Sequence, residues 1–319
     1  MSQGRPRKPQ QILLSKRANL FYLEHARVLQ KDERVLYLTE TLNDIDQYFN
    51  IPERNTALLL LGKGCSITDA AVRRLAESNV MLGFCGSGGT PLFASTEPVF
   101  LSPQSEYGPT EYMQAWARLW FDEAKRLDAA RDALRERIRY CRASWASNEY
   151  LRQHKVQPSG LAAGRFEQVI TAAISTQDLL LAEAAWARQL YALLARQHQV
   201  DFSRAEGVGA KDSKAERINS FLDHGNYLAY GLAAVALNGL GISFCFPLLH
   251  GKTRRGALVF DIADLVKDAL VMPLAFECGA NLRCTDQEFR GRMIETLQES
   301  EALDYLFGFV KSTCQKYDC

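Results

Sequence analysis

The feature of this sequence that most constrains its fold is a change of pattern partway along the chain. Residues 11–100 hold short runs of apolar and β-branched residues separated by polar turns, which is typical of β-strands. The stretch 88–110 then contains four prolines, which neither continue a helix nor fill the centre of a sheet. From Thr110 on, helix-forming residues with helical spacing dominate. The pattern predicts an α+β protein, with a β-rich N-terminal domain at 1–105 and an all-α domain at 106–319.

The composition is that of a globular protein without a strong charge bias. The 319 residues are 47% hydrophobic and 24% charged, and the formal net charge is +1. Any DNA binding would therefore depend on local basic patches. The eight cysteines include no CxxC pair, which favours reduced thiols of a cytoplasmic protein over disulfides or a zinc site. The polar N-terminus lacks a signal-peptide core, and the apolar runs are too short to cross a membrane.

A dense group of chemically active residues lies at 247–268, in the segment PLLHGKTRRGALVFDIADLVKD. His250 ends an apolar run, and Asp261 and Asp264 open an apolar segment that we interpret as a helix. Residues three apart on a helix share a face, so the two carboxylates project the same way. The cations between them and the imidazole are Lys252, Arg254 and Arg255. A divalent metal ion acting on a phosphate ester needs such a set: hard oxygen ligands, a nitrogen ligand, and cations for the phosphate.

The two acids also permit a purely structural interpretation. An Asp before an apolar helix, with another acid three residues later, is a signal for a helix N-terminus. On the local pattern alone, capping by Asp261 is favoured over a metal site, because a short motif is only a hypothesis until its structural context is known.

Two further helical segments carry polar residues in apolar surroundings. Glu183 lies in the segment 166–199, among leucines, alanines and a tryptophan. A carboxylate there is costly unless it is paired, exposed or bound to a metal ion, and the local pattern favours exposure on a polar stripe. Asn226 and Tyr230 lie four residues apart on a later helix, and hence on one face. They make either structural contacts between helices or contacts with a substrate.

Several stretches together resemble one family, the integrases of CRISPR adaptation, here called the Cas-one family, and in particular its subtype I-F branch. The stretches are SKRANLFYLEHARVL at 15–29, LLLLGKGCSITDAAVRRLAESNVMLGFCGSGGTPLF at 58–93, SPQSEYGPTEY at 102–112, FLDHGNYLAYGLAA at 221–234 and LHGKTRRGALVFDIADLVKD at 249–268. The resemblance covers most of the chain and is weakest at 140–180 and 201–217.

The resemblance implies a fold and a metal site. The family has a β-rich N-terminal domain, through which it forms homodimers, and an all-helical C-terminal domain. Its metal ligands are one Glu, one His and one Asp, and the matching residues are Glu183, His250 and Asp264. Asp261 matches a nearby acid that assists them, and Glu167 lies on the same predicted helical segment as Glu183. The implied metal ion is Mg²⁺ or Mn²⁺, and the imidazole suits Mn²⁺ better than the harder Mg²⁺.

The resemblance also implies a reaction. A 3′-OH end of double-stranded spacer DNA would attack a phosphodiester of the CRISPR repeat DNA by transesterification, and water in its place would give endonuclease cleavage. The cations Lys252, Arg254 and Arg255 would hold the DNA backbone. Asn226 and Tyr230 would orient DNA near the metal ion.

The implied protein partner is a fusion. In subtype I-F the second adaptation subunit, Cas-two, is fused to the helicase-nuclease, Cas-three, and homodimers of this chain would flank a dimer of that fusion. No membrane partner is expected.

Two other functions use the same sequence features. A stand-alone, structure-selective DNA nuclease of repair would employ the same metal ligands and would cleave DNA without joining it. A non-catalytic DNA-binding scaffold would use Asp261 only as a helix cap and would leave Glu183 exposed. The integrase is favoured over both, and the preference rests on the resemblance rather than on composition.

Overall fold

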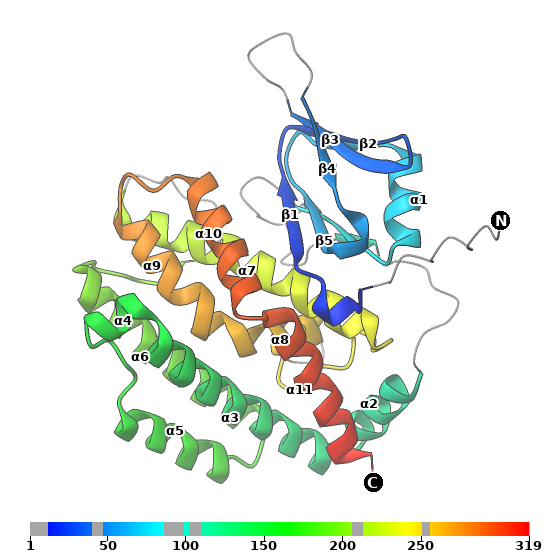
Figure 1. The fold of residues 1–319 in the computed structure, drawn as a ribbon. Coiled ribbons are helices and arrows are strands. Elements are labelled where there is room, and N and C mark those ends of the chain that lie inside the picture. Colours follow the sequence, from blue (N-terminus) through cyan, green and yellow to red (C-terminus); the bar gives the residue numbers. More distant parts are fainter. Residues whose placement is uncertain are drawn as a thin grey trace, which may run out of the picture.

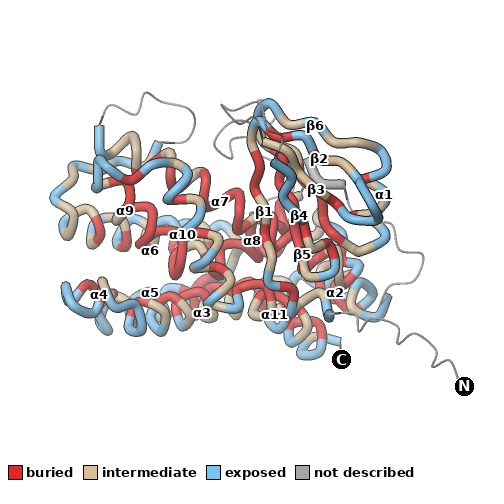
Figure 2. The backbone as a smooth tube through the Cα atoms, turned by 45° about the horizontal axis from the view of Figure 1, so that its top comes forward, coloured by how far each residue is buried: buried red, intermediate tan, exposed pale blue. Residues whose placement is uncertain are grey.

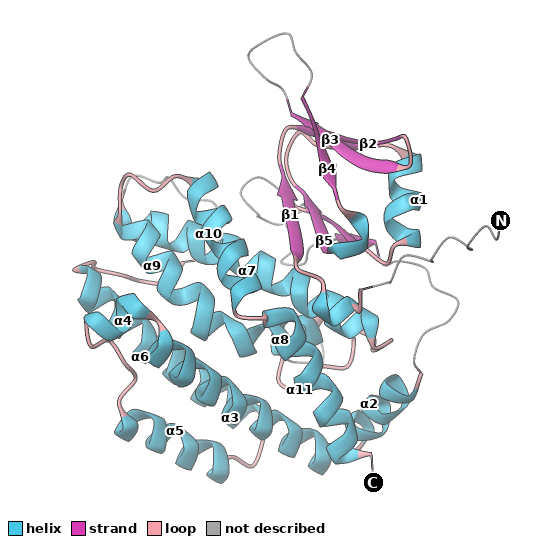
Figure 3. Cartoon of the chain, in the orientation of Figure 1, coloured by secondary structure: helices cyan, strands magenta, loops and turns pink. Residues whose placement is uncertain are grey.

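A computed structural model describes residues 12–39, 47–85, 99–101, 110–205, 213–250 and 256–318. The strands lie in one region and the long helices in another (Figures 1 and 3), so the predicted α+β class is confirmed. The predicted domain boundary at 105/106 falls within 102–109, outside the described residues. Among the helices that are described, none combines the length and apolar character needed to cross a bilayer.

The described part of the N-terminal region contains two four-stranded sheets and one α-helix. The first sheet has the order β1-β5-β7-β8, in which β1, β5 and β7 are parallel and the edge strand β8 is antiparallel to β7, and the second has the order β4-β3-β2-β6. The strands are β1 (Asn19–Leu23), β2 (Ala26–Lys31), β3 (Arg34–Thr39), β4 (Gln47–Ile51), β5 (Thr56–Leu61), β6 (Ser66–Ile67), β7 (Met81–Phe84) and β8 (Val99–Leu101). Helix α1 (Asp69–Glu77) is capped by Thr68, whose hydroxyl accepts the Ala71 amide.

Strand β5 is buried on both faces, which explains its uninterrupted apolar sequence TALLLL. Side chains alternate across a strand. Leu58 and Leu60 therefore face the helices, and Leu59 and Leu61 face the second sheet and α1. The first group belongs to one continuous hydrophobic core that extends into the helical region. Strand β5 thus joins the sheets to the helices.

The helical region is built around a central, largely buried helix, α7 (Lys214–Gly239), which packs against α8, α9 and β5 (Figure 2). A π turn (η4, Lys267–Val271) connects α8 to α9. The other helices are α2 (Glu111–Phe121), α3 (Glu123–Ser147), α4 (Glu149–Gln153), α5 (Gly160–Ala172), α6 (Thr176–His198), α8 (Ala257–Val266), α9 (Met272–Ala280), α10 (Asp286–Glu299) and α11 (Ala302–Tyr317).

Two helical segments were predicted to be longer than they are. The segment 166–199 contains the end of α5 and all of α6, because Ser175 and Asp178 form a capping box that starts a new helix. The amphipathic pattern of residues 286–319 predicts one helix, but the structure has two there, α10 and α11, separated where Glu301 adopts φ 46°. Neither break carries Gly or Pro, so the sequence gives only weak signals for them.

The tight crossing of α7 and α9 supplies a test of this packing. A Cβ atom on Gly279 would lie 2.8 Å from the Ile218 backbone nitrogen, so Gly279→Ala forces the two helices apart. We expect a loss of about 1–3 kcal/mol in the free energy of unfolding, measured by urea denaturation. The matched control is Gly291→Ala on α10, where a Cβ atom meets nothing within 4 Å. The control should retain or gain stability, by up to about 1 kcal/mol. Equal losses in the two variants would contradict the packing.

Candidate metal centre

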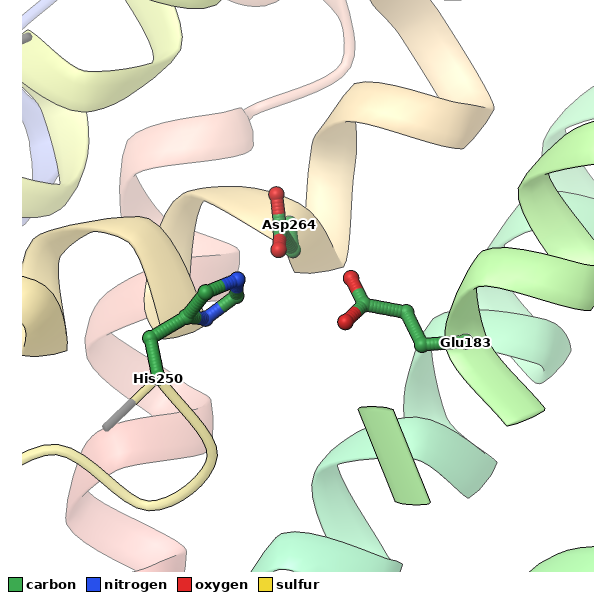
Figure 4. Close-up of side chains that lie close together, drawn as sticks. All are labelled: Glu183, His250 and Asp264. Carbon is green, nitrogen blue, oxygen red and sulfur yellow. The ribbon is translucent and has the colours of Figure 1, made fainter. Parts of the chain in front are cut away.

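Three side chains from distant parts of the sequence meet beside α8. Glu183 comes from α6, His250 from the segment that follows α7, and Asp264 from α8 (Figure 4). Each offers one ligand atom, and these atoms all lie within 4.8 Å of one another. The three residues are those that the family resemblance implies as metal ligands, and the fold gathers them at one point.

Helix α8 starts earlier in the sequence than a cap by Asp261 would require. The helix begins at Ala257, after Gly256 with φ 74°, so Asp261 lies in its second turn rather than at its start. The carboxylate of Asp261 does not cap this helix, and that interpretation is wrong. Every residue of α8 is buried, including Asp261 and Asp264. The helix therefore carries both acids into the protein interior.

Asp261 holds the segment that carries His250. Its Oδ2 accepts the backbone amides of Leu248 and Leu249 at 2.6 and 3.1 Å, and its Oδ1 accepts that of His250 at 3.2 Å. The same Oδ1 lies 2.6 Å from His250 Nδ1. A ring nitrogen that donates to a carboxylate leaves the other one to bind a metal ion, and the partner fixes the ring's orientation. Asp261 is thus a positioning residue for His250.

Glu183 is largely covered rather than exposed. Its side chain is only 13% exposed and accepts a hydrogen bond from the Arg137 guanidinium on α3, so the expectation of a solvated polar stripe is wrong. Glu167, the other glutamate of that predicted segment, lies on α5 and binds Arg135 at 2.6 Å. The structure therefore brings Glu183, and not Glu167, to His250 and Asp264.

Two cations that the sequence analysis did not single out adjoin the carboxylates. Lys267 Nζ lies 2.6 Å from Asp264 Oδ1, and an Arg137 nitrogen lies 3.6 Å from Asp264 Oδ2. Lys267 stands one helical turn after Asp264, a spacing that could have been noticed. Arg137 follows no local pattern that points to the site. Arg137 also makes two hydrogen bonds to Asp268, at 2.6 and 2.9 Å.

These charges control the protonation of the ligands. Burial lowers the pKa of the His250 imidazole, but the Asp261 hydrogen bond and the surrounding carboxylates outweigh it and raise that pKa to about 9. Burial opposes ionisation of Asp264, yet Lys267 and Arg137 hold its pKa well below the usual range. Burial raises the pKa of Glu183, and Arg137 counteracts the rise. Metal binding would require the neutral imidazole, so it would release the proton from His250.

The donor set fits a divalent cation. Two carboxylates and an imidazole combine hard oxygen ligands with one nitrogen. Asp264 Oδ1 is buried and pairs with Lys267 Nζ at 2.6 Å, and a carboxylate oxygen that pairs with one cation keeps a lone pair for a further ligand. With a neutral imidazole, the acids Glu183, Asp261, Asp264 and Asp268 outnumber the cations Arg137 and Lys267 by two. One divalent cation balances that difference.

The predicted DNA-contacting residues divide into two groups. Tyr230 lies beside the centre, because its hydroxyl is 3.3 Å from Lys267 Nζ. Asn226 is partly exposed one turn earlier on α7. The three cations Lys252, Arg254 and Arg255 lie outside the described residues.

Comparison with known proteins identifies a family to which this chain is similar. The sequence model described as "CRISPR associated protein Cas1" matches residues 20–304. A CRISPR-associated endonuclease Cas1 from Pectobacterium atrosepticum is 46% identical over 96% of this chain and 94% of that protein. The protein of the same name from Pseudomonas aeruginosa is 45% identical over 98% of this chain and 97% of that protein.

Solved structures of lower identity share the fold. A TtCas1–DNA complex matches with a TM-score of 0.64 at 24% identity, covering 92% of this chain and 91% of that one. A casposase bound to integration product matches with a TM-score of 0.70 at 15% identity, covering 93% and 91%. A Cas6-RT-Cas1–Cas2 complex matches with a TM-score of 0.67 at 13% identity, covering 98% and 37%. With its family match and its two nearly full-length relatives, the chain belongs to the Cas1 family, the endonucleases and integrases of CRISPR adaptation.

Proposed function

We propose that the cluster of Glu183, His250 and Asp264 binds a divalent metal ion and is the active centre of this Cas1 protein. The convergence of these three side chains on one point carries the proposal. A bound divalent ion would supply Lewis acidity toward a phosphate ester, which lowers the cost of developing negative charge. Mg²⁺ and Mn²⁺ are both suitable, and the imidazole ligand favours Mn²⁺.

The proposed reaction is transesterification of DNA. A 3′-OH end of double-stranded spacer DNA attacks a phosphodiester of the CRISPR repeat, and the repeat strand leaves with its own 3′-OH. Asp261 keeps the His250 ring in place, and Lys267 lies where it can meet a phosphate oxygen beside Asp264. Water instead of the 3′-OH gives cleavage at the same centre.

The proposal also extends to partners. Among the structures of similar fold, TtCas1 is in complex with DNA, the casposase is bound to an integration product, and Cas6-RT-Cas1 is in complex with Cas2. We propose double-stranded spacer DNA and CRISPR repeat DNA as substrates. We further propose a homodimer, a partner formed by Cas2 fused to the helicase-nuclease Cas3, and action in the cytoplasm. The free cysteines among the described residues accord with that compartment. Tyr230 and Asn226 on α7, with Lys252, Arg254 and Arg255, are the proposed DNA contacts.

The metal-binding role of Glu183 can be tested against a neighbouring acid. Glu183→Gln removes a charged ligand and should weaken Mn²⁺ binding by roughly 10-fold or more, measured by calorimetry on the purified full chain. Glu167→Gln is the matched control, because Glu167 pairs with Arg135 away from the cluster. Its Mn²⁺ affinity should equal that of the unmodified protein. Equal affinities in all three proteins would remove Glu183 from the centre.

The reaction itself can be tested with Asp264→Asn, which keeps the side-chain shape and removes the charge. We expect strand transfer to fall by about 100-fold or more, since the metal contributes several kcal/mol to stabilising the transition state. The assay mixes protein, with and without the fused partner, with a duplex bearing 3′-OH ends and a plasmid carrying a repeat. Cleavage without joining in the unmodified protein would favour the stand-alone repair nuclease. Joining that persists in Asp264→Asn would place the chemistry elsewhere.

A further inference from the structure

Arg137 occupies an unusual place, between the elements that carry two of the proposed ligands. It lies on α3 and is 4% exposed. One of its terminal nitrogens, Nη1, donates to Glu183 Oε1 on α6 and lies 3.6 Å from Asp264 Oδ2 on α8. The same guanidinium therefore contacts two carboxylates that lie on different helices, Glu183 on α6 and Asp264 on α8.

The guanidinium is itself held from behind. Its Nε and Nη2 donate to the two oxygens of Asp268, at 2.6 and 2.9 Å, in the planar, paired geometry that only Arg offers. Asp268 is fixed in turn by two buried indoles. Trp186 Nε1 donates to its Oδ2 at 3.1 Å, and Trp145 Nε1 donates to its backbone carbonyl at 2.9 Å. The orientation of the Arg137 plane is thus determined by the core.

Asp268 lies in the π turn η4, directly after α8. It stands four residues after Asp264, so the two carboxylates face Arg137 together. Such π turns are rare and occur often at functional sites. Here the turn supplies a buried carboxylate that is too well occupied by Arg137 and Trp186 to serve as a metal ligand.

Stability alone does not explain this arrangement. A buried ion pair is weak support for a fold, because apolar residues of similar volume would fill the same space without the cost of removing charges from water. What the guanidinium provides, and an apolar side chain cannot, is a fixed distance between Glu183 and Asp264.

We propose that Arg137 is a positioning residue, which presets the separation of the Glu183 and Asp264 carboxylates for one divalent metal ion. The inference rests on the proposed metal function. Two effects of Arg137 oppose one another, because a cation repels a metal ion while an aligned pair of ligands attracts it. Alignment of the two carboxylates outweighs the repulsion between Arg137 and the metal ion, because Asp268 already neutralises the Arg137 charge through two hydrogen bonds.

The experiment compares Arg137→Met, Arg137→Lys and the double variant Arg137→Met with Asp268→Asn. The double variant removes both buried charges and keeps a side-chain oxygen to accept the Trp186 indole. Mn²⁺ is the probe, followed by its electron paramagnetic resonance signal and by calorimetry on the full chain. Urea unfolding without metal is measured in parallel, and it separates core packing from metal binding.

We expect Arg137→Met to weaken Mn²⁺ binding by about 10–100-fold, the usual effect of removing a group that orients a metal ligand. The double variant should regain most of the unfolding stability but not the affinity. Arg137→Lys, which keeps the charge without the paired geometry, should bind Mn²⁺ with intermediate affinity and with a changed resonance line shape.

Several results would overturn the inference. Mn²⁺ binding as tight as in the unmodified protein, in either Arg137→Met or the double variant, would show that Arg137 only packs the core. If Arg137→Met does not fold, the double variant and Arg137→Lys decide the matter in the same way. Failure of the unmodified protein to bind Mn²⁺ would instead refute the proposed metal function, and the positioning role with it.

Discussion

The site depends on one buried carboxylate, that of Asp261. A charged group in an apolar interior must have its oxygens occupied, and Asp261 meets this need with three consecutive backbone amides and the His250 ring. The segment that follows α7 has no regular hydrogen-bonding pattern of its own at this point. Its amides gain partners from α8 instead, and this fixes where the imidazole lies. Without Asp261, the three backbone amides and the His250 ring would lose their partner.

The same requirement organises the rest of the centre. Each further carboxylate of the centre has a cation or an indole beside it: Lys267 for Asp264, Arg137 for Glu183 and Asp268, and Trp186 for Asp268. Because these groups come from α3, α6, α8 and η4, the charge network also fixes the order in which those helices pack. The centre is consequently built on the core of the helical region, with Asp264 buried and Glu183 and His250 partly exposed.

Sequence patterns gave the outline of the fold and part of the site, for definable physical reasons. The change from strand to helix patterns is encoded in runs of several residues, so it could be predicted. His250, Asp261 and Asp264 lie within fifteen residues of one another, and their association was visible locally. Glu183 was assigned by family resemblance, because its local surroundings predicted exposure. Arg137 could not be found, since its partners lie 46 and 131 residues away and no periodicity links them.

The prediction that Asp261 caps a helix failed because the start of α8 is set by Gly256, whose left-handed backbone the local pattern of acids does not reveal. The breaks near Ser175 and Glu301 were missed for a related reason. Ser175 starts α6 by accepting a backbone amide, and Glu301 precedes α11 with a positive φ, and both features are geometry that only the folded chain displays.

The double burial of β5 has a consequence for how the protein unfolds. Leu58 and Leu60 belong to the same core as α7, while Leu59 and Leu61 belong to that of the second sheet. Removing either region would leave one face of this strand in water, with an apolar surface that favours aggregation. The sheets and the helices should therefore melt as a single cooperative unit. A destabilising substitution in β5 would lower the concentration of folded protein, and with it the total activity, without changing the chemistry in the helical region.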